Sequence, residues 1–213
     1  SNINDFYINI YKTIKYLTMS NSNFNSKSLE TYIGNIKLVN PFFNASGCWC
    51  YNNKQLDDLM NSDCGAIITK TMTLYSRAGN PEPRYFDNKT LSVNSMGLPN
   101  NGYEYYINYK NKFLQDTTKG NNKSLVKPLL KPLFFSISTM NLENTYKMVN
   151  NIVNNESEGI SGIEFNISCP NIVGKGQMGY DREQLTNFIN DLSHLTQLFD
   201  ISRNQLAIGF KMS

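Results

Sequence analysis

Short apolar runs alternate with amphipathic stretches along most of the chain, from about residue 29 onward. Five of the apolar runs predict the principal β-strands: residues 41–47, 65–71, 132–138, 163–168 and 206–212. Apolar residues at helical spacing predict helices over 53–61, 142–153 and 182–198, with a further helix that Asn100 caps and that ends near Phe113. Two shorter segments, 36–39 and 91–95, are predicted to be extended. Such alternation is typical of parallel βαβ units.

The predicted strands lack alternation of polar and apolar residues, which indicates a sheet that is covered on both faces. A barrel and an open doubly wound sheet both fit this pattern. No G-x-G-x-x-G motif follows the first strand, which argues against an open sheet that binds a nucleotide. Polar side chains recur where successive strands end, as they do at the catalytic face of TIM barrels. We therefore expect an α/β fold, a TIM (β/α)8 barrel of which this chain carries about the first five βα units.

Residues 1–28 differ from the rest and are expected to form an N-terminal extension, either flexible or a surface helix. Residues 6–17 have the spacing of an amphipathic helix, and a targeting or membrane-surface role for it stays open. Residues 29–213 are expected to form the barrel portion. No run of the sequence is long and apolar enough to cross a membrane.

The composition argues against several classes of function. The chain is 40% hydrophobic and 17% charged, as globular proteins are, and its net charge of +3 is too small to indicate a nucleic-acid partner. The four cysteines are unevenly spaced and no secretory leader is visible, which favours reduced thiols in the cytoplasm. The single histidine, His194, argues against Ser-His-Asp catalysis. The Cys48-Trp49-Cys50 run is too short and unpartnered for zinc, so no metal is expected.

Cys169 stands directly after the predicted strand 163–168, before a glycine-punctuated loop. A buried structural thiol is one interpretation. A nucleophilic thiol normally needs a histidine or a helix N-terminus, and the one histidine lies within the predicted helix 182–198. A general base is more compatible with this setting, because it only has to accept a proton from a bound substrate.

Lys70 and Lys211 each end an apolar strand, where a lysine must reach polar atoms. Either could hold an anionic ligand or a reduced cofactor, and a Schiff-base lysine of an aldolase is the competing idea for Lys211. Asn94, Asn166 and Asn171 suit a planar ligand with amide-like edges, because each offers a donor and an acceptor. The alternative for any single asparagine is a turn former.

Five segments form one ordered set: NPFFNASG (40–47), ITKT (68–71), GNPEPRY (79–85), NSMGLPN (94–100) and NISCPN (166–171). In this order and spacing they resemble the N-terminal portion of dihydroorotate dehydrogenase, in its soluble, fumarate-linked class 1A form. A serine base would point to the membrane-linked quinone class, whereas this chain has Cys169. The run 95–100 is similar to class 1A rather than to the NAD-linked class 1B.

The resemblance implies an FMN-containing TIM barrel that oxidises dihydroorotate to orotate in pyrimidine biosynthesis, as a cytoplasmic homodimer that uses fumarate. It implies that Cys169 removes the C5 proton of dihydroorotate while a hydride passes from C6 to flavin N5. It also implies that Lys211 stabilises the reduced flavin.

The implied site residues fall into three groups. Catalytic positions are Cys169, Lys211 and Ser168. Substrate positions are Lys70, Asn94, Met96, Gly97, Leu98, Asn166 and Asn171. Flavin positions are Ala45, Ser46, Lys70, Thr71, Asn166 and Lys211.

The sequence also departs from the family pattern. Thr139 stands where a small residue, usually glycine, is expected after the third principal strand. The family's last three strands, which carry the FMN phosphate site, are not among these residues. The rival interpretation is a truncated, non-catalytic half-barrel that does not bind FMN alone.

Overall fold

The computed structural model describes residues 29–114, 131–168, 177–199 and 206–212. The predictions for residues 1–28, Cys169 and Asn171 lie outside these ranges. Among the helices that the structure describes, none combines the length and apolar character that a membrane crossing requires.

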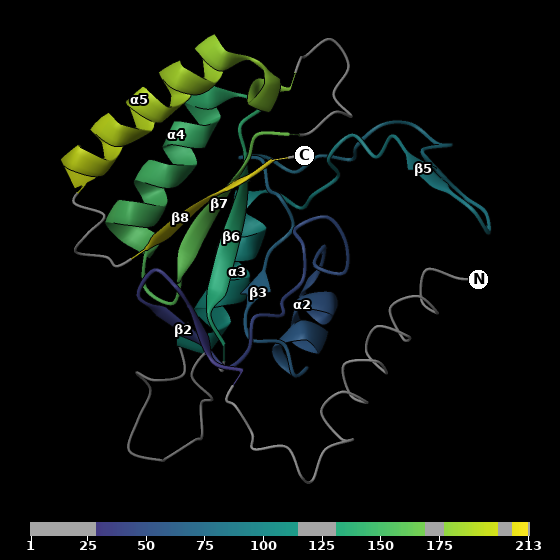
Figure 1. Cartoon of the computed structure of the whole chain (residues 1–213), viewed down its shortest axis with the longest axis horizontal. Helices are drawn as coiled ribbons and strands as arrows, with labels where there is room; N and C mark the ends of the chain where they lie inside the picture. The colour runs from purple at the N-terminus through teal and green to yellow at the C-terminus, as the bar shows by residue number, and fades with distance from the viewer. Residues whose placement is uncertain (1–28, 115–130, 169–176, 200–205, 213) are drawn as a thin grey trace, which may run out of the picture.

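Four parallel strands form the centre of the fold, in the order β3-β6-β7-β8 (Figure 1). They are β3 (Ile67–Ile68), β6 (Leu133–Ser138), β7 (Gly162–Asn166) and β8 (Ala207–Lys211). A parallel bridge between Phe43 and Ala66 places the segment around residue 43 beside the strand that contains β3. The predicted parallel arrangement is therefore confirmed for four of the five principal strands, whereas the predicted strand 41–47 forms a single bridge.

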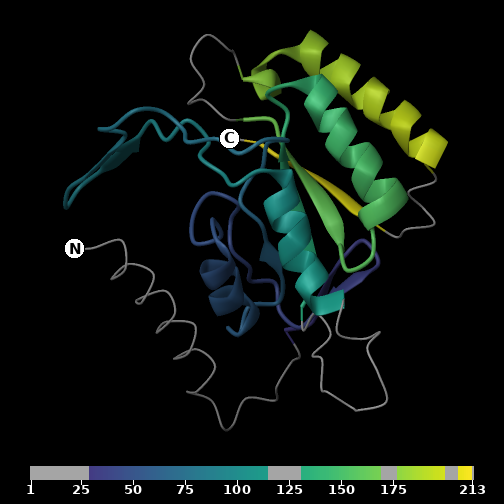
Figure 2. The ribbon, with the colours of Figure 1, turned by 180° about the vertical axis from the view of Figure 1, so that it is seen from behind.

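Four helices pack around the outside of this sheet (Figure 1, Figure 2). They are α2 (Asn53–Met60), α3 (Tyr103–Leu114), α4 (Leu142–Asn151) and α5 (Arg182–Phe199). A π-helix, η2 (Ile152–Glu156), extends α4, and a 3-10 turn, η3 (Met178–Tyr180), precedes α5. Asparagine side chains cap two of the helices, because the oxygens of Asn52 and Asn141 accept backbone N–H groups of the first turns of α2 and α4.

The predicted cap of α3 is wrong. The helix begins at Tyr103, and Asn100 stands three residues earlier. The side-chain oxygen of Asn100 accepts hydrogen bonds from the backbone N–H groups of Gly102 and Thr73. Asn100 therefore stabilises the turn that leads into the helix and ties that turn to residue 73, beyond β3.

Two antiparallel hairpins flank the sheet. The first pairs β1 (Thr31–Ile33) with β2 (Ile36–Leu38), and the second pairs β4 (Tyr85–Asp87) with β5 (Ser92–Asn94). The extended segments 36–39 and 91–95 are confirmed, whereas their partner strands were not predicted. The second hairpin projects away from the body of the fold in both views (Figure 1, Figure 2).

Apolar residues pack on both faces of the sheet. Leu133 and Phe135 join the larger core under the helices, while Phe134 belongs to a second cluster with Leu38 and Ile68. Leu38 comes from β2, so the first hairpin covers the N-terminal end of the inner face with an apolar floor. All six residues of β6 are buried, so the sheet is covered on both faces at its centre as predicted, whereas three of the five residues of the edge strand β8 are exposed.

The strand that contains β3 carries one extra residue at the C-terminal side of the sheet. Ile68 is paired with Phe134, and Met72 with Ile137, so a four-residue step on one strand faces a three-residue step on the other. An extra residue of this kind is a bulge, which re-aims side chains near a sheet edge. The bulge ends the regular strand at Ile68, whereas the prediction extended the strand to residue 71. It also turns the Thr71 side chain toward Ser136.

Phe188 ties α5 to the sheet and offers a stability test. Its ring is fully buried and meets the Phe165 ring edge-on, with the centroids 5.4 Å apart. We expect Phe188→Ala to lower the free energy of unfolding by about 3–5 kcal/mol, because it removes a large core side chain. The matched control is Ile189→Ala on the same helix, since Ile189 is 45% exposed. Urea unfolding should separate the two variants, and equal losses would contradict this packing.

Candidate active site

The inner face of the sheet changes from apolar to polar toward the C-terminal ends of its strands. Above the floor that Phe134 helps to form, Ser136 of β6 is in register with Glu164 of β7. One step further along the strands, Asn166 of β7 is in register with Lys211 of β8. Because the strands are parallel, these side chains gather at one end of the barrel interior.

A hydrogen-bonded group, which we call the polar cluster, occupies this end. It consists of Ser46, Thr71, Ser136, Glu164, Asn166 and Lys211. The Lys211 Nζ donates to Ser46 Oγ at 2.6 Å and to Thr71 Oγ1 at 3.3 Å. The Asn166 side-chain N–H reaches Thr71 Oγ1, also at 3.3 Å. Four of the expected flavin positions thus lie in one network.

The polar cluster is buried except at its charged ends. Ser46, Thr71 and Ser136 are at most 1% exposed. The side chains of Lys211 and Glu164 are 30% and 22% exposed. A ligand at the C-terminal end of the barrel can therefore reach the Lys211 ammonium, while the buried hydroxyls of Ser46 and Thr71 hold that ammonium in place.

Lys70 and Ala45 lie beside the polar cluster. The buried Lys70 Nζ donates to the carbonyl oxygen of Gly47, in the loop that follows Ala45 and Ser46. The Ser46 carbonyl accepts from the N–H of Thr71 at 3.1 Å, which fixes this loop to the strand that contains β3. Both lysines that the sequence analysis singled out are therefore close to the same loop.

Of the expected substrate positions, Asn94 is the last residue of β5, and Met96, Gly97 and Leu98 lie on the loop that follows. Gly97 and Leu98 have φ angles of +71° and +59°, and the Gly97 carbonyl accepts from Arg77 Nε at 2.6 Å. A Cβ at Gly97 would lie 2.3 Å from the side-chain oxygen of Asn80, so only glycine fits there. The loop is thus held in one shape by residues 77–80.

Ser168 and Thr139 each form a hydrogen bond with Asn166. Ser168 is buried, and its N–H donates to the Asn166 side-chain oxygen at 3.3 Å. Thr139, which replaces an expected small residue, is also buried, and its hydroxyl donates to the Asn166 carbonyl at 2.9 Å. The larger side chain is therefore accommodated by a hydrogen bond to the strand end. Cys169 and Asn171 lie outside the described residues.

Two members of the polar cluster, Ser136 and Glu164, were not predicted from the sequence. The signal was present, because polar residues occupy every second position at the ends of their strands: 136 and 138 in one, 164 and 166 in the other. This alternation was not recognised, because the strands were interpreted as apolar along their whole length.

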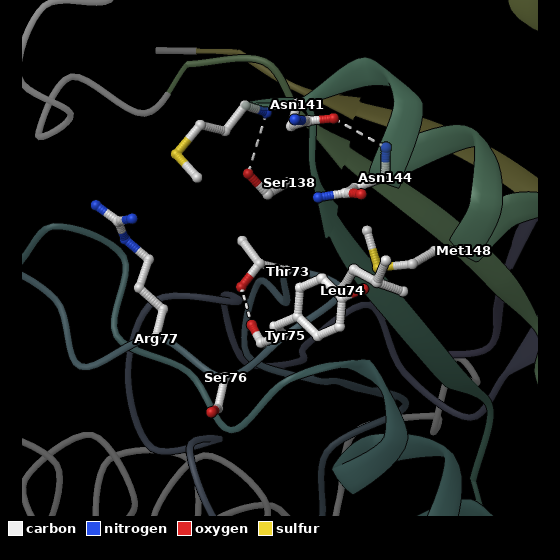
Figure 3. Close-up of a pocket in the computed structure, with 10 residues that line it drawn as sticks. Thr73, Leu74, Tyr75, Ser76, Arg77, Ser138, Asn141, Asn144 and Met148 are labelled. Carbon is white, nitrogen blue, oxygen red and sulfur yellow. Dashed lines mark hydrogen bonds between the residues drawn. The ribbon is translucent and has the colours of Figure 1, made fainter.

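A separate cavity of about 180 Å³ lies beside the start of α4 (Figure 3). Residues 73–77 and Met148 line it, together with Ser138, the sheet neighbour of Asn166. None of the expected site residues that the structure describes lines it. Within the described residues, no three histidine, cysteine or acidic side chains are grouped as a metal site would require.

Comparison with known proteins gives one consistent family. A family model described as dihydroorotate dehydrogenase matches residues 28–212. Dihydroorotate dehydrogenase (fumarate) of Lachancea kluyveri is 42% identical over 183 residues, which are 86% of this chain and 52% of that protein. Dihydroorotate dehydrogenase A (fumarate) of Lactococcus lactis subsp. cremoris is 40% identical over 164 residues, 77% of this chain and 49% of that protein.

A solved structure agrees on the fold. The structure of DHODH from Eimeria tenella in complex with ferulenol matches with a TM-score of 0.60 at 18% identity, covering 88% of this chain and 50% of that one. Together with the parallel sheet, this confirms the predicted partial TIM barrel. The chain spans about half the length of the curated relatives it matches.

Two neighbouring cysteines test the burial of the loop beneath Lys70. Cys48 is exposed, whereas Cys50 is buried, and burial raises the pKa of the Cys50 thiol to about 12. A raised pKa favours the unreactive thiol form at neutral pH. At pH 8 we expect iodoacetamide to modify Cys48 and to spare Cys50 in the folded protein, as read by peptide mass spectrometry. In urea both should react alike. Equal labelling of the two in the folded protein would contradict the burial of Cys50.

Proposed function

Because this chain belongs to the dihydroorotate dehydrogenase family, we propose that it forms part of an active site that oxidises dihydroorotate to orotate in pyrimidine biosynthesis. The names of the relatives support fumarate as the final electron acceptor. The observation that carries the proposal is the contact between Lys211 and Ser46 at the C-terminal end of the barrel interior. By the family resemblance, the protein acts in the cytoplasm as a homodimer.

The polar cluster suits FMN as the cofactor. The flavin ring is flat, with nitrogen and oxygen atoms along one edge, and an ammonium beside hydroxyl and amide donors fits such an edge. We assign Ala45, Ser46, Lys70, Thr71, Asn166 and Lys211 to its binding. When bound, FMN supplies a two-electron acceptor for a hydride. In this proposal Lys211 stabilises negative charge that develops on the ring.

The surroundings of Lys211 favour this function over an aldolase. A Schiff-base lysine must lose its proton, which apolar surroundings or a second cation promote. Lys211 instead donates to two hydroxyls and lies 3.5 Å from the carboxylate of Glu164, so its immediate partners are polar and acidic rather than apolar. A charged lysine suits the stabilisation of an anionic ligand.

The substrate is proposed to lie over the flavin, held by Lys70 and Asn166 from the strand ends and by Asn94 and residues 96–98 from the loop after β5. Asn171 is assigned to the same role from the family motif. The positive φ of Leu98 supports this assignment, since strained backbone of this kind recurs at ligand sites.

Cys169 is proposed as the general base. It follows Ser168, which we assign with it and Lys211 to the catalytic positions, and no described histidine lies near this strand end to support a nucleophilic mechanism. The thiolate takes the C5 proton of dihydroorotate while the C6 hydrogen leaves with its electron pair. Orotate then has the new C5–C6 double bond, and the proton remains on the sulfur.

Single-turnover kinetics of the full-length protein test this role. We expect Cys169→Ser to slow flavin reduction by dihydroorotate at least about a hundredfold, the scale of general base catalysis. Orotate binding should change far less, because the substitution keeps the size of the site. The rate in the unsubstituted enzyme should rise with pH as the thiolate fraction grows. Equal reduction rates, or a flat pH profile, would defeat the assignment of the base.

A further inference from the structure

We propose that Glu164 is a positioning residue that orients Ser46 and Lys211 and sets how strongly the site stabilises negative charge on a bound flavin. The inference rests on the proposed function, because it assigns the flavin to the polar cluster. Glu164 is the one acidic member of that cluster, and neither the sequence motifs nor the family resemblance assigned it a role.

The position of Glu164 in the sheet brings its carboxylate under the cluster. It lies in the middle of β7, in register with Ser136 on one side and with Gly209 on the other. The space where a side chain of Gly209 would begin is open. One carboxylate oxygen, Oε1, accepts from Ser136 Oγ at 2.7 Å and from Ser46 Oγ at 2.8 Å.

These two hydrogen bonds decide the direction of the others. A serine hydroxyl has one proton, so a serine that donates to Glu164 must present lone pairs to its remaining neighbours. Ser46 therefore accepts from Lys211 Nζ at 2.6 Å and from Thr71 Oγ1 at 3.1 Å. A carboxylate can only accept, which makes Glu164 the group that keeps Ser46 turned toward the lysine.

Glu164 also balances the charge of Lys211 without taking up its ammonium. The distance from Lys211 Nζ to Oε1 is 3.5 Å, longer than the usual 2.7–2.9 Å or so of a charge-assisted hydrogen bond. Two of the three N–H groups of the ammonium are directed to Ser46 and Thr71. Within the described residues, the third N–H group has no partner closer than this carboxylate, so we assign it to a ligand, and the carboxylate reduces the positive potential that the ligand meets.

Sulfite binding to the flavin of the full-length protein measures that potential. Sulfite adds to flavin N5 and leaves a negative charge on the ring, so more positive surroundings tighten its binding. Glu164→Gln keeps the side-chain size and an acceptor oxygen but removes the charge. We expect its sulfite dissociation constant to fall about threefold or more, a modest part of the interaction expected between charges at this separation. The flavin midpoint potential should move in the positive direction.

Two controls separate this effect from a structural one. Glu164→Asp retains the charge and should return the sulfite dissociation constant toward that of the unsubstituted protein. Glu156→Gln removes the same charge from a carboxylate 2.8 Å from the buried Lys110, at the end of η2. This control should leave sulfite binding unchanged. Glu164→Gln with flavin bound and an unchanged sulfite dissociation constant overturns the proposal.

A second variant covers the case in which Glu164→Gln loses its flavin. Ser136→Ala frees one hydrogen bond of Oε1 and lets the carboxylate approach Lys211, so sulfite should bind more weakly. Unchanged or tighter sulfite binding in that variant also overturns the proposal. A protein that binds flavin and sulfite but does not oxidise dihydroorotate refutes the proposed function alone. An unsubstituted protein without flavin refutes both.

Discussion

The hydrogen bond between Lys211 and Ser46 joins two points that are 165 residues apart in the chain. It forms only if the parallel strands are in the observed register and the loop after residue 43 lies against the strand that contains β3. The same contact links the outermost described strand, β8, to the segment at the opposite side of the sheet. The geometry of the candidate site therefore depends on the assembly of the whole sheet rather than on any local motif.

Because the hydroxyls of the polar cluster are buried, each of them needs a hydrogen-bond partner within the protein. Hydroxyls that are removed from water must find partners, and a single unsatisfied one costs about 1–3 kcal/mol. Ser46 and Ser136 donate to the carboxylate of Glu164, and Thr71 donates its one proton to a serine of the same cluster. The apolar floor beneath, where Phe134 packs with Ile68 and Leu38, keeps water from entering at the other end. A polar layer on an apolar floor thus presents one ammonium at the open end of the barrel.

Hydrophobic periodicity was enough to predict the helices, because each buries one face against its neighbours. Apolar runs predicted four of the five principal strands, because β6 and β7 at the centre of the sheet are buried on both faces. Lys70 and Lys211 could be recognised as site candidates from the sequence, because a lysine that follows an apolar run has to reach polar atoms. The bulge before Thr71 was not predictable, because it depends on pairing with β6, including the hydrogen bond from the Ser136 N–H to the Thr69 hydroxyl. The role of Glu164 depends likewise on partners from β6, from β8 and from the loop that carries Ser46.

The central claim is that this polar cluster holds a flavin that dihydroorotate reduces. The visible spectrum of the purified protein, recorded without oxygen before and after dihydroorotate is added, tests it most directly. We expect a flavin absorbance band that disappears when the substrate is added. A colourless protein, or a flavin band that dihydroorotate leaves unchanged, would contradict it.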